Sequence, residues 1–252
     1  MHKIAGFSDP THHNFLLKVV LKGAKRIHSL KPTRKREPIT VHLLGKVLSQ
    51  IRRTRSITKK DRHMLAAAFA LAFFGLLRIS EFTVSSMKEF NPRIHATRSS
   101  VHLSKNHYTF YLSRSKTDQY GHGQYIYIPR ITGKLCPYAA MATYLKEPGR
   151  SLPERAIPLF VFASGKPLSR NSCLKHLHSA LSKVGRNPKK FNTHSFRIGA
   201  ATSAAHAGIS TSVIKVLGRW RSDAYTRYTR SHGHAIKAAA TKLAKLASKH
   251  KT

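Results

Sequence analysis

The chain has 252 residues, 41% of them hydrophobic, enough to form one large domain or one domain with an appendage. Its charge is the dominant feature, because 46 lysines and arginines stand against 9 aspartates and glutamates, a formal net charge of +37. Self-repulsion on this scale favours a polyanionic partner, with nucleic acid first and an anionic membrane surface second. On composition alone, a ribosomal or chromatin protein without catalytic chemistry also fits.

The scarcity of acidic residues limits the chemistry. Nine scattered carboxylates do not supply the converging ligands of a two-metal nuclease or polymerase site, so we expect any cutting of nucleic acid to need no metal and no cofactor. Cys136 and Cys173 provide no disulfide framework and fit a reducing compartment. The sequence opens without a signal pattern, and the apolar run at 64–77 is too short to cross a bilayer. These features predict a soluble, intracellular protein.

The N-terminal part reads as one helix followed by a linker. Residues 12–28 carry a helical apolar pattern with basic flanks, and residues 29–39 contain two prolines and a basic cluster. One helix cannot bury a core alone, so this piece is either the end of a larger domain or an arm that docks elsewhere. The basic cluster fits a nuclear address, a DNA-backbone contact or a solvated linker.

The next segment predicts two helices. Thr40 is placed to cap a helix whose apolar residues recur between 41 and 51. A second helix begins near Thr58 and becomes almost wholly apolar over 66–77, so we expect it to be buried on all sides.

The rest of the chain predicts one small sheet followed by helices. Residues 99–130 are rich in aromatic and β-branched residues around a glycine-rich turn, which indicates a β-hairpin or a three-stranded meander. Residues 158–162 are short and extended. Further helices are expected at 136–147, 169–184, 194–207, 210–217 and 235–249. The predicted fold class is α+β, mainly α-helical, with one small antiparallel β-sheet.

Four separate segments carry residues suited to a phosphodiester. They contain cations, a proton carrier, an indole donor and a phenolic oxygen, which such a site would need. In chain order these candidates are Arg78 with Glu81, Lys116, His194 with Arg197, and Trp220 with Tyr225 and Tyr228. His194 and Arg197 are three residues apart, a spacing that places two side chains on one face of a helix.

In this order the residues resemble the signature of the tyrosine recombinase (phage integrase-like) family, Arg…Lys…His-x-x-Arg…His/Trp…Tyr. The resemblance covers about residues 36–246. It implies a catalytic domain at 36–252, preceded at 1–35 by the remnant of a core-binding (DNA-clamp) domain and a basic linker. The implied activity is DNA strand cleavage and rejoining, as in site-specific recombination or DNA integration by a mobile element, through a 3′-phosphotyrosyl intermediate.

The resemblance also implies roles for the phosphate-binding residues. Arg78 and Arg197 would meet the charge on the non-bridging oxygens with forked donors, for which lysine is a poor substitute. Trp220 would donate its indole N–H to the same phosphate, although a lone tryptophan also suits core packing. Glu81 matches the family's supporting acidic position and would orient a catalytic residue.

The proton carriers are assigned in the same way. Lys116 resembles the general acid that protonates the leaving 5′-oxygen, with Lys105 and Arg114 as nearby competitors. His194 resembles the acid/base or hydrogen-bonding partner.

The nucleophile is assigned to Tyr228, with Tyr225 as the alternative. Tyr228 follows Trp220 by eight positions, one fewer than the spacing associated with the family, and Tyr225 lies closer still. Both tyrosines precede Thr-Arg, so spacing decides the assignment.

The remaining expectations concern partners. Double-stranded DNA is the expected ligand, with self-assembly into a dimer or tetramer on DNA through the C-terminal helix and no membrane partner. The rival hypothesis is a recombinase-derived DNA-binding protein that no longer cleaves, and a nuclear location is expected if the host is eukaryotic. The expected DNA-binding residues are Arg34, Lys35, Arg36, Arg219 and Arg221.

Overall fold

The computed structural model describes residues 14–30, 36–115, 118, 122–147 and 157–220, whose contacts fall into two units, 1–35 and 36–252. In the first unit, α1 (Phe15–Leu30) runs two residues past the end at 28 predicted from the sequence. Six of its large apolar side chains are exposed, so this helix has apolar surface that it cannot bury alone: Phe15, Leu16, Val19, Val20, Leu21 and Ile27.

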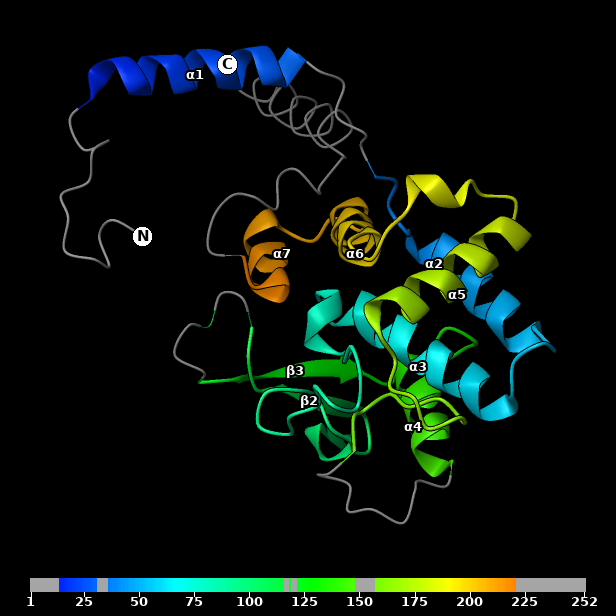
Figure 1. Cartoon of the computed structure of the whole chain (residues 1–252). Coiled ribbons are helices and arrows are strands. Elements are labelled where there is room, and N and C mark those ends of the chain that lie inside the picture. The colour runs from blue at the N-terminus through cyan, green and yellow to red at the C-terminus, as the bar shows by residue number, and fades with distance from the viewer. Residues whose placement is uncertain (1–13, 31–35, 116–117, 119–121, 148–156, 221–252) are drawn as a thin grey trace, which may run out of the picture. The chain divides into compact units, whose positions relative to one another are not determined.

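The second unit is built around α3. Thr40 caps α2 (Val41–Arg53) and Thr58 caps α3 (Lys59–Phe74), each through a hydroxyl that accepts the backbone N–H three residues further on. Residues 64–73 of α3 are all buried, which confirms the expected all-round burial. The helix packs against α2, α4 (Pro137–Lys146) and α6 (Ser195–His206) (Figure 1).

The sheet is the predicted antiparallel meander. Its strands are β1 (Val101–Leu103), β2 (His107–Leu112) and β3 (Gln124–Pro129), in the order β1-β2-β3. In β2 every second side chain is buried, among them Tyr108 and Phe110, because one face of the sheet covers the core.

The remaining elements also follow the sequence prediction closely. Residues 158–162 form isolated bridges rather than a strand, and the helix expected at 235–249 lies outside the described residues. No helix in the described part of the chain has the length and apolarity to cross a membrane. The helices are α4 (Pro137–Lys146), α5 (Arg170–Lys183), α6 (Ser195–His206) and α7 (Thr211–Gly218).

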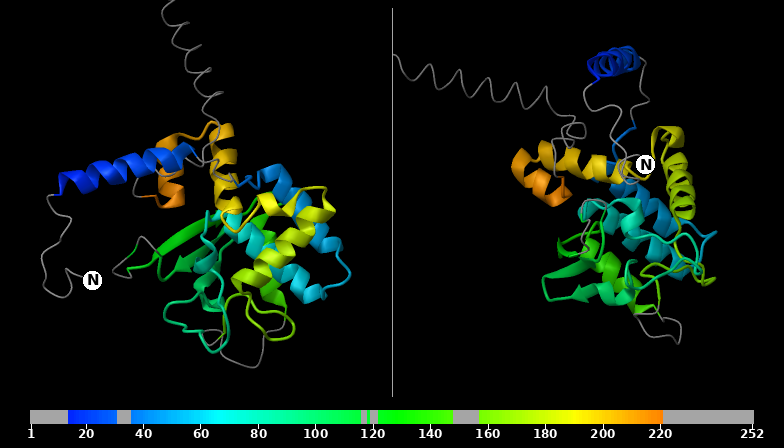
Figure 2. Two further views of the ribbon diagram at one scale, coloured as in Figure 1. Left: turned by 45° about the horizontal axis from the view of Figure 1, so that its top comes forward. Right: turned by 60° about the vertical axis from the view of Figure 1, so that its left-hand side comes forward.

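Helix α6 packs closely against the segment that precedes α2. A Cβ atom on Gly199 would lie 1.7 Å from the Ile39 carbonyl oxygen, so no larger residue fits without a backbone shift. The Ile39 N–H also donates to the Ser195 carbonyl at 2.9 Å. These contacts bring the first turn of α6 to the C-terminal end of α3, and α7 lies beside α6 in every view (Figures 1 and 2).

Candidate active site

A buried carboxylate organises the turn that follows α3. Glu81 ends a short 3-10 helix (Ile79–Glu81), and its side chain is only 3% exposed. It accepts a hydrogen bond from the Arg78 backbone N–H at 2.8 Å and another from Arg78 Nη1 at 2.9 Å. Because a buried carboxylate is stable only when it is paired, this pairing fixes both the backbone and the guanidinium of Arg78. The Arg78 side chain keeps 18% of its surface exposed.

A second arginine reaches the same carboxylate from the end of α7. Arg219 adopts a left-handed backbone conformation (φ 57°), and its side chain, 8% exposed, turns into the protein. Its Nη2 lies 3.2 Å from Glu81 Oε2 and 3.1 Å from the Leu76 carbonyl, and Nη1 donates to the Gly75 carbonyl at 3.0 Å. Burial lowers the pKa of Arg219, while the Glu81 carboxylate raises it.

Arg219 was expected from the sequence to contact DNA. In this structure its guanidinium is turned inward and paired with Glu81. The Arg219 Nε atom is buried without a hydrogen-bond partner in the described part of the chain. Arg219 is therefore an interior link between α7 and the turn after α3.

The third guanidinium belongs to Arg197, in the first turn of α6. Arg197 is 3% exposed, and it donates from Nη1 to the Leu76 carbonyl at 2.6 Å and from Nη2 to the Gly218 carbonyl. The Leu76 carbonyl thus accepts from both Arg197 and Arg219. Leu76 itself has φ 46°, so an uncommon turn after α3 presents this oxygen to both guanidiniums.

Trp220 covers the Arg197 guanidinium. The carbon at the centre of the guanidinium lies 4.3 Å from the centroid of the indole ring, a cation–π contact. A Cβ atom on Gly218 would lie 1.7 Å from the ring, so glycine at this position leaves room for the indole. Trp220 is half-buried and packs against the hydrophobic core, as expected for core packing.

His194 lies beside these cations but outside the helix. It is the residue that caps the start of α6, and it is more accessible than Arg197, which is buried. Partial burial lowers the pKa of His194, and the positive charges of Arg197, Arg170 and Arg78 lower it further. This shift favours the neutral imidazole, which is able to accept a proton.

A cavity of about 500 Å³ separates Trp220 from the connection between β2 and β3. Ser115 and Asp118, which flank Lys116 in the sequence, line this cavity together with Arg219 and Trp220. Arg36, an expected DNA contact, donates to the Lys189 carbonyl at 2.7 Å. The remaining predicted residues lie outside the described part of the chain: Lys116, Tyr225, Tyr228, Arg34, Lys35 and Arg221.

Three guanidiniums and one carboxylate leave a net positive charge at this position. Forked donors that are held in place suit an anion with several equivalent oxygens, such as a phosphodiester. The sequence interpretation missed the inward role of Arg219. That role follows from the left-handed backbone of Arg219 and from the position of the buried Glu81 carboxylate.

A sequence profile described as the phage integrase family matches residues 42–234 of the chain. The chain belongs to this family. No curated protein sequence matches it. Its helices and three-stranded sheet form the catalytic-domain fold of the phage integrase (tyrosine recombinase) family.

Solved structures show the same fold at low identity. XerH recombinase in a post-cleavage complex with its difH substrate matches with a TM-score of 0.61 and 14% identity, over 81% of this chain and 52% of XerH. A lambda integrase dimer bound to a COC′ core site matches with 0.52 and 16%, over 81% and 50%. The Tn1549 transposon integrase matches with 0.50 and 16%, over 84% and 66%. The chain thus spans about half the length of the XerH and lambda proteins.

Proposed function

We propose that the chain cleaves and rejoins DNA strands in site-specific recombination or integration, through a 3′-phosphotyrosyl intermediate at Tyr228 and without a metal ion. The convergence of guanidiniums carries this proposal. Arg78 and Arg197 come from segments far apart in the sequence, and both are held at the turn after α3. Membership of the phage integrase family supports the reaction class.

The proposed roles of the arginines follow from their exposure. Arg78 is the most accessible of the three guanidiniums, so it would meet a non-bridging phosphate oxygen directly. Arg197 lies beneath Trp220, and its guanidinium would add positive charge to the phosphate site. Arg219 acts as a positioning residue, because it holds Glu81 and the Leu76 carbonyl, which in turn hold the other two arginines.

The proposed reaction conserves the bond energy of the phosphodiester. The Tyr228 hydroxyl attacks the scissile phosphorus, its proton passes to neutral His194, and the bond from phosphorus to O5′ breaks. Lys116 gives a proton to the departing O5′, which leaves as a 5′-hydroxyl. Attack by the 5′-hydroxyl of another strand on the phosphotyrosine reverses the steps and rejoins the DNA.

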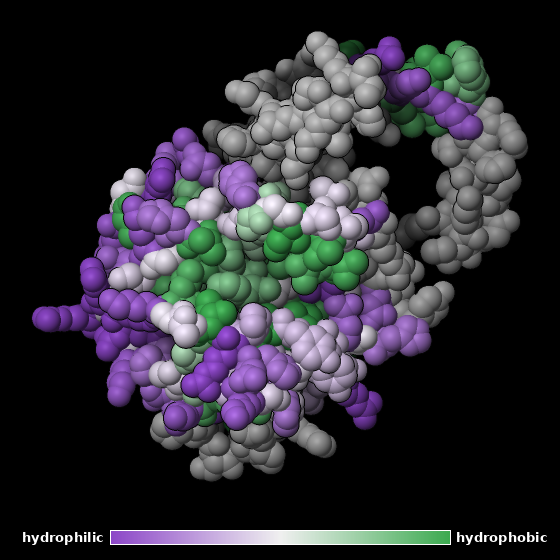
Figure 3. Space-filling model, turned by 180° about the vertical axis from the view of Figure 1, so that it is seen from behind, coloured by the Kyte–Doolittle hydropathy of each residue, from purple (hydrophilic) through white to green (hydrophobic). Residues whose placement is uncertain are grey.

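We also propose that the protein assembles on double-stranded DNA. Residues 1–35 would belong to the DNA clamp, with Arg34, Lys35, Arg36 and Arg221 as backbone contacts and the C-terminal helix reaching a neighbouring protomer. The exposed side chains of α7 support an additional contact between copies. Val213, Val216 and Leu217 are 47–76% exposed, and Figure 3 shows an apolar area over α6 and α7 with hydrophilic side chains around it.

A suicide substrate tests the proposal. Nicked DNA that releases a short fragment after cleavage traps the covalent intermediate, so the protein should form a protease-sensitive adduct with DNA. The adduct should be absent in Tyr228→Phe and present in Tyr225→Phe. An adduct lost only in Tyr225→Phe would assign the nucleophile to Tyr225 instead. Salt-sensitive binding without any adduct, also in a longer chain that supplies a full DNA clamp, would instead favour a recombinase-derived binding protein.

A further inference from the structure

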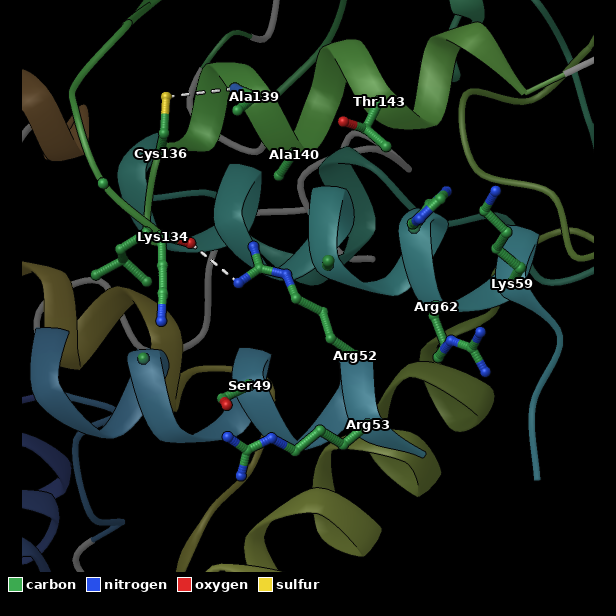
Figure 4. Close-up of a pocket in the computed structure, with 15 residues that line it drawn as sticks. Ser49, Arg52, Arg53, Lys59, Arg62, Lys134, Cys136, Ala139, Ala140 and Thr143 are labelled. Atoms are coloured by element: carbon green, nitrogen blue, oxygen red, sulfur yellow. Dashed lines mark hydrogen bonds between the residues drawn. The ribbon is translucent and has the colours of Figure 1, made fainter. Parts of the chain in front are cut away.

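A second basic cluster lies in a pocket of about 730 Å³ between α2, α3 and α4 (Figure 4). Among the described residues that line this pocket, none is acidic, and within the described ranges none of its five lysines and arginines forms an ion pair. These five cations are Arg52, Arg53, Lys59, Arg62 and Lys134.

Two of the arginines are held by backbone carbonyls. Arg52 Nη1 donates to the Lys134 carbonyl at 3.0 Å, and Arg62 Nη1 donates to the carbonyls of Thr54 and Ile57 at 3.2 and 3.1 Å. Figure 4 shows Arg52 between α2 and α4, with Arg62 to one side. Arg52 keeps access to solvent, and the partial burial of its guanidinium lowers its pKa. Each guanidinium has five N–H donors, so both retain donors for a ligand.

The residues that line the pocket between these cations have small side chains. Gly45, Ala66, Ala139 and Ala140 line the pocket, so its volume falls in the range of small-molecule sites. Residues of the N-terminal half of α3 and of α4 line it, together with the last turn of α2.

We propose that this pocket binds a phosphate-bearing ligand of nucleotide size. Planar arginine forks match phosphate oxygens, and the small residues leave room for the body of a nucleotide. A second copy of this chain offers few groups that would neutralise the pocket, because its 9 acidic residues stand against 46 lysines and arginines. The pocket is distinct from the candidate active site, since it lies on the N-terminal half of α3 while Arg78 follows its C-terminal end. Sixteen helical residues span about 24 Å.

Binding of ATP to the full chain, measured by calorimetry, tests the proposal. Arg52→Gln combined with Lys59→Gln should raise the Kd for ATP by at least about tenfold, the effect of losing one charge-assisted hydrogen bond. The matched control, Lys88→Gln with Arg93→Gln, removes the same charge from exposed positions outside the pocket and should leave the Kd unchanged. Thr143→Glu, which adds a carboxylate to the pocket wall without removing an arginine, should weaken binding independently.

A short DNA duplex distinguishes a free nucleotide from nucleic acid as the source of the phosphate. If the pocket holds backbone phosphates, the pocket variant should lower the salt dependence of duplex binding by about two counterions, and the control should not. Weaker binding of ATP by the pocket variant supports a phosphate site, and so does a smaller salt dependence of its duplex binding. Equal weakening by the pocket and control variants, with melting temperatures unchanged, would overturn the proposal. So would tighter binding of a polyglutamate peptide than of ATP.

Discussion

The two basic clusters of residues 36–252 hold their arginines in different ways. At the candidate active site, Arg78 and Arg219 share the buried Glu81 carboxylate, and each of their side chains is at most 18% exposed. In the pocket, Arg52 and Arg62 are held by carbonyls and stay within reach of solvent, and in the described part of the chain they form no ion pair.

This difference indicates that the candidate active site controls the positions of its donors, whereas the pocket controls the affinity for an anion. A buried, charge-paired arginine has a fixed position, and fixed donors stabilise a transition state without reorganising. An arginine that lacks a counterion adds more attraction for an anion but tolerates more movement. We therefore expect substitutions at the candidate active site to cost folding free energy and reaction rate, and substitutions in the pocket to cost ligand affinity.

The largest effect is expected from Glu81→Gln. This change leaves the buried Arg219 guanidinium without its counter-charge, and breaking a buried ion pair costs about 3–5 kcal/mol. Urea denaturation measures the loss as a lower midpoint. Glu89→Gln, at an exposed acid, is the matched control and should change the free energy of unfolding by no more than about 0.5 kcal/mol. Equal stability of the two variants would contradict the charge-paired description of the site.

Replacing glycine by alanine should destabilise the protein near the candidate active site and stabilise it at the pocket. In Gly199→Ala the new methyl meets the Ile39 backbone, and such overpacking costs about 1–3 kcal/mol of folding free energy. Gly45, on the pocket side of α2, has no atom within 4 Å of the position that a methyl group would take, so Gly45→Ala should stabilise the helix by up to about 1 kcal/mol. Thermal unfolding of both variants checks the pair, and a stable Gly199→Ala protein would show that α6 is able to move away from Ile39.

A substitution that keeps the charge tests whether Arg219 acts through the position of its guanidinium or through its attraction for DNA. Arg219→Lys retains a cation but loses the fork that spans Glu81 and two carbonyls, so adduct formation should slow by about 10–100-fold through misplacement of Arg78 and Arg197. DNA affinity should change little, because the net charge is the same. Arg53→Lys in the pocket should leave the rate of adduct formation unchanged. A loss of DNA affinity equal to the loss of rate would instead assign Arg219 to DNA binding.

The sequence predicts the elements of this fold better than the contacts of its site. Apolar periodicity and the caps at Thr40 and Thr58 identify α2 and α3, because those signals act within a few residues. The contact of Gly199 with Ile39 and the inward turn of Arg219 depend on segments more than a hundred residues apart. From the sequence, Arg219 is expected to be a surface cation. Only its left-handed backbone and the position of Glu81 direct its side chain inward.

The smallest effect is expected from the pH dependence of stability at His194. Its pKa is lowered in the folded state by burial and then by Arg197, Arg170 and Arg78, so the unfolded chain binds its proton more readily. The stability that neutral His194 retains above its unfolded pKa of about 6.5 should therefore decline as the pH falls below that value. His194→Gln should remove part of this decline in urea midpoints between about pH 7 and pH 5, while His206→Gln, at an exposed residue at the end of α6, serves as the matched control. Identical pH profiles for the two variants would show that the three arginines do not act on His194.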